Sequence, residues 1–133
     1  MRYCLDSWAV LRWLEGANSS AARVERMLAD RPVMSWINVG EVFYVTRRAA
    51  GPAIAHEVVD DLRRILVLDE VTPERVLQAV EIKADHPMAL GGAFAIACAV
   101  AHDAVLVTGD PEILDAHGPW QTDDLRKRRR GRT

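Results

Sequence analysis

The stretch AVLVTGD, residues 104–110, has the pattern of a buried β-strand that ends in a tight turn, and it decides the fold class. Its apolar, β-branched run stops at a glycine, an aspartate and Pro111, which are typical turn residues. Similar short runs at residues 2–6, 33–36 and 67–68 predict three further strands. Helical patterns separate the strands, and this alternation predicts an α/β fold with a parallel sheet flanked by helices.

The helices between these strands are predicted from the spacing of apolar residues and from capping residues at their ends. Ser7 is expected to cap the first helix, which stops near Gly16. Asn38 is expected to start the helix that closes near Gly51, and residues 72–74 form a strong helix start. Another helix is predicted after the possible caps at residues 18–20, and Pro32 ends it. The remaining predicted helices cover residues 52–66, 93–101 and 112–114.

Length and composition are those of one globular domain without a membrane segment. The chain has 133 residues, half of them hydrophobic, and a formal net charge of −2. No pattern continues beyond Trp120, so we expect a domain over residues 1–120 and a basic tail over residues 121–133. No apolar run approaches the ~20 residues of a membrane span. The early acid Asp6 argues against a signal peptide, so a cytoplasmic location is expected.

Two carboxylates are expected at the carboxyl ends of strands, where ligands usually bind in open parallel sheets. Asp6 ends the first predicted strand and Asp110 follows the last one, so they meet if these strands are neighbours. Glu41, in the first turn of the helix after residues 33–36, is expected at the same edge. Purely structural interpretations also exist: a helix cap for Asp6, a turn for Asp110, and for Glu41 a capping box with Asn38.

Three carboxylates at one edge would raise one another's pKa unless a cation balances them. Mg²⁺ or Mn²⁺, which prefer hard oxygen ligands, would relieve this repulsion and activate a water for phosphodiester hydrolysis. The four histidines form no ligand pattern, and the sequence has no HxxxH or CxxC spacing, so no zinc site is expected. Cys4 and Cys98 are expected to be buried free thiols. The sequence contains no phosphate-binding glycine loop and no nucleophile elbow.

Four motifs, taken in order, resemble those of PIN domains, in particular the VapC-like toxins of bacterial toxin–antitoxin pairs. They lie at residues 5–7, 38–41, 86–97 and 106–110, and the likeness extends from Met1 to about Asp115. The resemblance implies a PIN-like three-layer α/β/α sandwich with a central parallel sheet. It also implies a Mg²⁺- or Mn²⁺-dependent endoribonuclease that forms a homodimer and binds a cognate antitoxin. The implied catalytic metal ligands are Asp6, Glu41 and Asp110, oriented through hydrogen bonds by Ser7, Asn38 and Thr108.

Gly92 departs from the family pattern, which has an aspartate where this sequence has the pair Gly91-Gly92. Glycine is less favourable than alanine by about 1 kcal/mol in a helix interior, and nothing in the local sequence requires it. We interpret Gly92 as a substitution, native or introduced, that removes one ligand charge and weakens metal binding. The chain is expected to be much less active than its Gly92→Asp form. For the nearby acids Asp85 and Asp115, a loop and an exposed surface position are expected.

Two other functions remain open at this point. A catalytically dead PIN domain would hold RNA or an antitoxin without cleaving, and loss of cleavage with EDTA or with Asp6→Ala would separate the two. A receiver-like signalling domain would need paired acids after the first strand and a lysine after the last, whereas Pro111 follows Asp110 here. An antitoxin is expected to cover apolar helix surface around Leu11 and Trp13.

Overall fold

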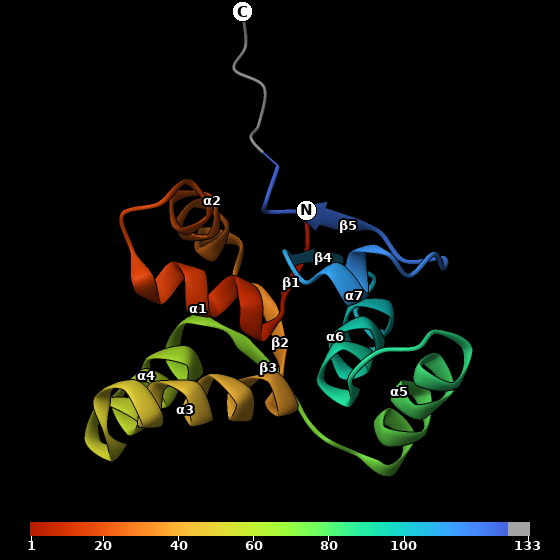
Figure 1. The fold of residues 1–133 in the computed structure, drawn as a ribbon, viewed down its shortest axis with the longest axis horizontal. Helices are drawn as coiled ribbons and strands as arrows, with labels where there is room; N and C mark the ends of the chain where they lie inside the picture. Colours follow the sequence, from red (N-terminus) through yellow and green to blue (C-terminus); the bar gives the residue numbers. More distant parts are fainter. Residues whose placement is uncertain (128–133) are drawn as a thin grey trace, which may run out of the picture.

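The computed structural model describes residues 1–127, and a parallel sheet lies at its centre (Figure 1). The strands are β1 Tyr3–Leu5, β2 Val33–Ser35, β3 Val67–Asp69, β4 Val105–Thr108 and β5 Thr122–Asp124. They form a five-stranded sheet in the order β3-β2-β1-β4-β5, and every neighbouring pair is parallel. The predicted α/β class with a central parallel sheet is therefore confirmed.

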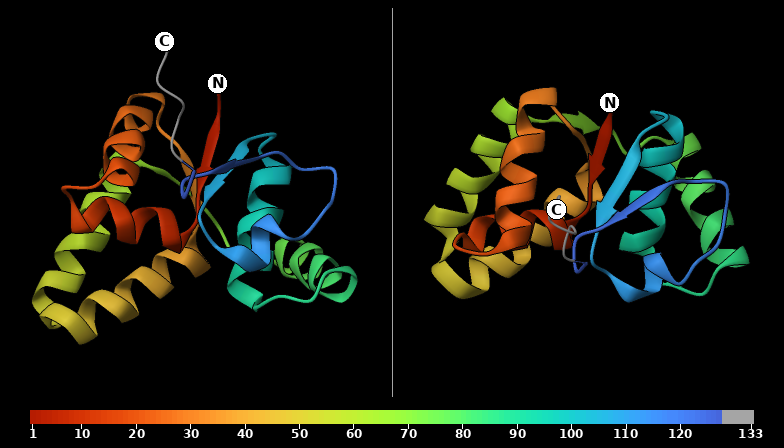
Figure 2. Two further views of the ribbon diagram at one scale, coloured as in Figure 1. Left: turned by 45° about the horizontal axis from the view of Figure 1, so that its top comes forward. Right: turned by 90° about the horizontal axis from the view of Figure 1, so that it is seen from above.

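Helices cover both faces of this sheet. They are α1 Ser7–Glu15, α2 Ser19–Met27, α3 Trp36–Ala50, α4 Pro52–Ile65, α5 Pro73–Asp85, α6 Leu90–Ala101 and α7 Pro111–Leu114, with a 3₁₀ turn at Leu28–Asp30. Helices α1 to α4 lie on one side of the sheet, and α5 to α7 lie on the other (Figures 1 and 2). This arrangement is the predicted three-layer α/β/α sandwich.

Alternate residues of the central strands supply a separate core to each face of the sheet. Cys4 and Leu106 are buried in the cluster that contains α6. Leu5 and Val107, one position further along the same strands, are buried with residues of α1 to α4. Because both faces are covered, the inner strands appear in the sequence as continuous apolar runs.

Helix α6 is the buried helix that the alanine-rich segment predicts, but it begins at Leu90, three residues before the predicted start at Ala93. Gly91 and Gly92 therefore lie in its first turn. Residues 93–99 are all buried, because small side chains let the helix approach the sheet closely. Within residues 1–127 no single helix has the length and apolar character to cross a membrane. Helices α5 and α6 reach that length and apolar character only when they are taken together, and the pair is bent by 116°.

Two predicted helix starts are wrong, and in both cases the helix begins where the preceding strand ends. Asp6 caps α1, so Ser7 is the first residue of that helix and not its cap. Ser35 caps α3 through a hydrogen bond from the Ile37 N–H at 3.2 Å. Asn38 therefore lies inside α3, and the predicted capping box with Glu41 does not form.

Strand β5 extends the sheet past Trp120, where the sequence predicts no further element. It pairs in parallel with β4, and Leu125 directly after it is 2% exposed. Thr122–Asp124 carries no apolar alternation, because this edge strand is held by backbone pairing and not by burial of its own side chains. The ordered fold thus runs beyond the predicted boundary at residue 120. Residues 128–133 of the predicted basic tail lie outside the described residues.

Candidate functional site

Asp6 and Thr108 lie side by side at the carboxyl edge of the two central strands. Strands β1 and β4 are paired in register up to this edge. One Asp6 carboxylate oxygen accepts a hydrogen bond from the Thr108 hydroxyl, and the other accepts one from the Ala9 N–H at 2.9 Å. The Asp110 N–H donates in turn to the Thr108 hydroxyl oxygen at 2.9 Å. The first and last predicted acids are therefore linked through one threonine.

Gly109 makes this edge compact because the ring of Trp8 packs directly against it. A Cβ at position 109 would lie 2.4 Å from Cζ2 of Trp8, which is too close for any side chain. Asp110, the next residue, caps α7 by accepting a hydrogen bond from the Glu112 N–H at 2.9 Å. Asp6 and Asp110 both cap helices, so a structural role and a place in the site coexist in each of them.

Glu41 reaches the same region from α3 and is positioned by Asn38. The Asn38 amide donates to Glu41 Oε1 at 2.8 Å and to the Gly91 carbonyl at 3.0 Å. The carboxylate lies against Gly91, where a Cβ would be 2.2 Å from Glu41 Oε2. Asn38 is 1% exposed, and its Oδ1 has no hydrogen-bond partner within residues 1–127. One buried oxygen is thus available to a ligand or a water beside Glu41.

The pKa of Asp6 reflects both its burial and the two other acids. Burial raises the pKa of Asp6 to about 7, because its carboxylate is removed from water. The hydrogen bonds from Thr108 and Ala9 lower this pKa, since they stabilise the ionised form. The negative charges of Asp110 and Glu41 raise it again, so both acids lie near enough to act on Asp6.

The donors of this site suit a hard divalent cation. They are the carboxylates of Asp6, Glu41 and Asp110, whose charges act together on Asp6, and all of them offer oxygen atoms. Within residues 1–127 the three acids do not form a group whose ligand atoms all lie within 4.8 Å of one another. An ion would therefore be held partly through water molecules, which Mg²⁺ retains readily.

Gly92 has different surroundings from Gly91, although both lie in the first turn of α6. A Cβ at position 92 would lie 3.3 Å from Cγ1 of Ile113 and 3.6 Å from Sδ of Met88, contacts that side-chain shifts can relieve. Its backbone does not have a positive φ. Neither space nor conformation requires glycine at position 92, which agrees with its interpretation as a substitution. A side chain at position 91, in contrast, would force the Glu41 carboxylate to move.

The other acids and the serine that the sequence singles out lie at the margin. Ser7 is half-buried and makes no side-chain hydrogen bond to the three acids among the residues described. Asp85 and Asp115 are exposed, one at the end of α5 and the other directly after α7.

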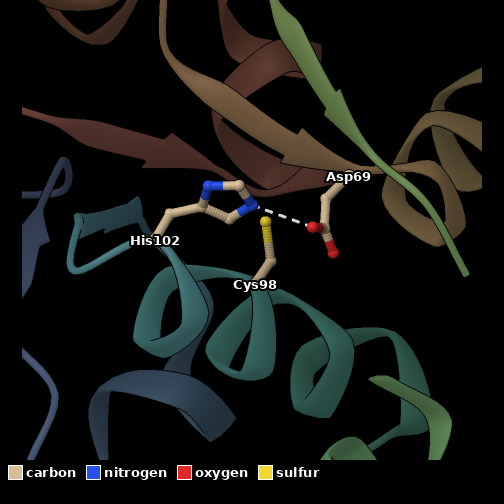
Figure 3. A group of neighbouring side chains, drawn as sticks. All are labelled: Asp69, Cys98 and His102. Carbon is tan, nitrogen blue, oxygen red and sulfur yellow. Dashed lines mark hydrogen bonds and ion pairs between the residues drawn. The ribbon is translucent and has the colours of Figure 1, made fainter. Parts of the chain in front are cut away.

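The structure also brings together Asp69, Cys98 and His102, a group that the sequence did not predict (Figure 3). Cys98 is fully buried, as expected, and so is Cys4. The expectation of no zinc-type ligand group is therefore corrected for the described residues. The missed signal is the spacing of Cys98 and His102, four residues apart on one helix face.

Comparison with known proteins agrees with this architecture. The sequence model of a family described as PIN domain matches residues 3–118. No curated protein matches the chain. Two similar solved structures are VapBC-1 from nontypeable Haemophilus influenzae, at 19% identity and a TM-score of 0.73, and DNA-bound VapBC from Salmonella typhimurium, at 15% and 0.77. The match to VapBC-1 covers 96% of this chain and 100% of that one. The match to the Salmonella typhimurium structure covers 94% of this chain and 98% of that one.

A third similar structure is that of VapC20 from Mycobacterium tuberculosis, described as a sarcin-ricin loop cleaving toxin. It is 16% identical, with a TM-score of 0.69, and the match covers 85% of this chain and 93% of that one. At these identities the likeness to solved structures shows a shared fold.

Proposed function

The chain belongs to the PIN domain family, and we propose that it acts as a VapC-like toxin. In this proposal it is an endoribonuclease that depends on Mg²⁺ or Mn²⁺, cleaves RNA phosphodiesters with a metal-activated water and is neutralised by a cognate antitoxin. The observation that carries the proposal is the buried Asp6, whose pKa is raised to about 7 beside Glu41 and Asp110. The capping of α1 by Asp6 needs only a side-chain oxygen and no buried charge, so an ionisable carboxyl group at this sheet edge favours a functional site.

Each residue of the site has a role in this mechanism. Asp6, Glu41 and Asp110 would hold the cation, which when bound stabilises charge on the phosphate and lowers the pKa of a coordinated water. Thr108 fixes the orientation of Asp6, and Asn38 fixes that of Glu41. Because the pKa of Asp6 is about 7, its protonated and ionised forms coexist near neutral pH. A cation held by these acids would favour the ionised form of Asp6.

The proposal includes an antitoxin, an RNA substrate, a homodimer and a cytoplasmic location. Leu11 and Trp13, expected at the antitoxin surface, are partly buried in the core around α1 to α4. Leu14 of α1 and Tyr44 and Val45 of α3 are more exposed, at 39%, 60% and 43%. Their apolar surface supports an antitoxin that covers this side of the sheet, since a partner gains most by burying exposed apolar area.

A second function, binding without cleavage, is favoured by one specific observation. Positions 91 and 92 contribute no carboxylate, and Glu41 occupies the space over Gly91. A site with fewer charges binds a hard cation more weakly, so the chain could hold RNA or an antitoxin and not cut.

An RNA cleavage assay separates these two functions. The purified protein is incubated with RNA in the presence of Mg²⁺ or Mn²⁺, and in a parallel reaction with EDTA. The Asp6→Asn variant is assayed under the same conditions. Asp115→Asn serves as the matched control, because it changes an exposed acid away from the site. The nuclease proposal expects cleavage that EDTA and Asp6→Asn abolish and Asp115→Asn preserves. RNA that stays intact in every metal, but is still retained by the protein, would support the binding module instead.

A further inference from the structure

Three different metal-ligating side chains meet at the opposite end of α6 from the glycine pair (Figure 3). Asp69 is the last residue of β3, Cys98 lies in the last turn of α6, and His102 directly follows that helix. A carboxylate oxygen, the thiol sulfur and an imidazole nitrogen all lie within 4.8 Å of one another. This group shares no residue with the site around Asp6.

Regular secondary structure places these side chains. The His102 N–H continues the helical pattern by donating to the Cys98 carbonyl at 3.1 Å, so the two side chains lie on the same face. Asp69 reaches them from the end of β3 and is 8% exposed. Ligands held by a helix and a strand are better fixed than ligands held by loops, so the group is preorganised.

Asp69 is already ionised and oriented. Its Oδ1 lies 2.8 Å from His102 Nε2, and its Oδ2 accepts a hydrogen bond from Arg75 Nε at 2.7 Å. Burial favours a higher pKa for Asp69, but the hydrogen bonds from Arg75 and His102 outweigh it and hold the pKa below its usual value. Arg75 also donates from Nη2 to Oδ1 at 3.1 Å, so Arg75 contacts both carboxylate oxygens, and Oδ1 in addition faces His102.

We propose that Asp69, Cys98 and His102 bind a zinc ion at a site with three protein ligands and one open position, independently of the proposed nuclease function. Thiolate, imidazole and carboxylate are the ligands that zinc takes in proteins. Bonds of about 2.0–2.3 Å in a tetrahedron place ligand atoms about 3.3–3.8 Å apart. The contact between Asp69 and His102 must therefore open slightly, and the other separations must close by at most about 1 Å.

The protons of this site can be accounted for. Zinc displaces the thiol proton of Cys98, which leaves to solvent, and it binds Nε2 of the His102 tautomer that carries its proton on Nδ1. The hydrogen bond between His102 Nε2 and Asp69 is thereby replaced by two bonds to the ion. The thiolate and the Asp69 carboxylate bring two negative charges, and Arg75, which is paired with Asp69, leaves one net positive charge at the site. Arg75 keeps its bond to Oδ2 and orients the ligand, while its contact with Oδ1 must open. A water completes the tetrahedron. The bound ion would tie β3 to the end of α6.

Zinc binding by the full chain tests this proposal. The protein is freed of metal with a chelator and titrated with zinc alone. Stoichiometry is measured by elemental mass spectrometry and affinity by competition with a chromophoric chelator. We expect one zinc per chain, and an affinity loss of more than about 100-fold in Cys98→Ala and in His102→Gln, beyond the effect of losing an outer partner. Cobalt(II) in place of zinc should give a thiolate charge-transfer band that Cys98→Ala removes.

Asp6→Asn serves as the control, because it alters the carboxylate site and no member of the group. It should retain the ion. Cys4→Ala is unsuitable as a control, because the buried Cys4 thiol lies next to the thiol of Cys98. The His102 side chain is 25% exposed, so His102→Gln keeps the test decisive even if Cys98→Ala fails to fold. Zinc that fails to bind, that survives His102→Gln, or that is lost equally in a folded Asp6→Asn protein would overturn the assignment.

Discussion

Replacing Asp6 by asparagine should abolish function and at the same time stabilise the metal-free protein above neutral pH. Asparagine keeps the shape of the side chain and the oxygen that caps α1. It removes a carboxylate that is 3% exposed and whose pKa burial raises to about 7. The charge that the proposed cation requires is therefore a cost to the fold when no cation is present.

The magnitude follows from linkage between proton binding and folding. Below about pH 4 Asp6 is protonated in both the folded and the unfolded chain, so it contributes no penalty. As the pH rises, the unfolded chain ionises first, and stability is lost until the folded pKa of about 7 is passed. The full loss corresponds to about 4 kcal/mol, of which about 3 kcal/mol falls between pH 5 and pH 8.

Urea unfolding in EDTA, monitored by circular dichroism, measures this effect. The unchanged chain should lose about 3 kcal/mol more than Asp6→Asn between about pH 5 and about pH 8. Groups such as Asp69, whose pKa is lowered by Arg75 and His102 in spite of burial, affect both proteins equally and cancel in the comparison. Added Mg²⁺ should stabilise the unchanged chain at the higher pH and leave Asp6→Asn unaffected.

Asp115→Asn is the matched control, because the loss of an exposed acid is expected to change stability by less than about 0.5 kcal/mol. The reasoning is refuted if Asp6→Asn is less stable than the unchanged chain at about pH 8, or if the two proteins show parallel pH profiles.

Three further changes test neighbouring parts of the site. Gly92→Asp should raise the rate of metal-dependent RNA cleavage. Gly91→Ala should lower this rate, because its Cβ would displace the Glu41 carboxylate. Equal cleavage rates in the unchanged chain and in both variants would contradict this expectation. Thr108→Val removes a hydrogen bond that stabilises ionised Asp6, so the pKa of Asp6 should rise further, and an NMR titration of that carboxyl group would show a higher midpoint. Gly109→Ala places a Cβ against the ring of Trp8 and should lower the free energy of unfolding by about 1–3 kcal/mol, as measured by urea unfolding. An unchanged free energy of unfolding would exclude the close packing of Trp8 against Gly109.

The order of strands and helices could be predicted because its signals are local. The cap and proline at the start of α5 lie where expected, and so does the apolar run of β4. The first residues of α1 and α3 were harder to predict from the sequence, because no loop separates each helix from the strand before it. Asp6 directly follows β1 and Ser35 ends β2, and each of them also caps the next helix. Strand β5 could not be predicted, because Thr122–Asp124 is polar and is defined by a partner distant in sequence.

The convergence of Asp6 and Asp110 could also be predicted, because parallel strands bring their carboxyl ends to one edge. The contacts that position Glu41 could not. Asn38 donates to the carbonyl of Gly91, 53 residues away, and no pattern in either segment indicates the other. Asp69 is likewise separated from His102 by 33 residues, so only half of that group, the Cys98–His102 spacing, was visible in the sequence.

The glycine pair and the raised pKa of Asp6 belong to one electrostatic balance. Glu41 and Asp110 already raise the pKa of Asp6. The resemblance to the family pattern implies that an aspartate at position 92 would add a further negative charge to this site. Like charges in a buried site raise one another's pKa, so the metal-free protein would become less stable above neutral pH. Glycine at position 92 avoids this destabilisation of the metal-free protein, but it supplies no negatively charged metal ligand. We therefore expect Gly92→Asp to bind Mg²⁺ more tightly and to unfold more easily in EDTA; a variant with stronger metal binding and undiminished metal-free stability would show that the two effects are not coupled.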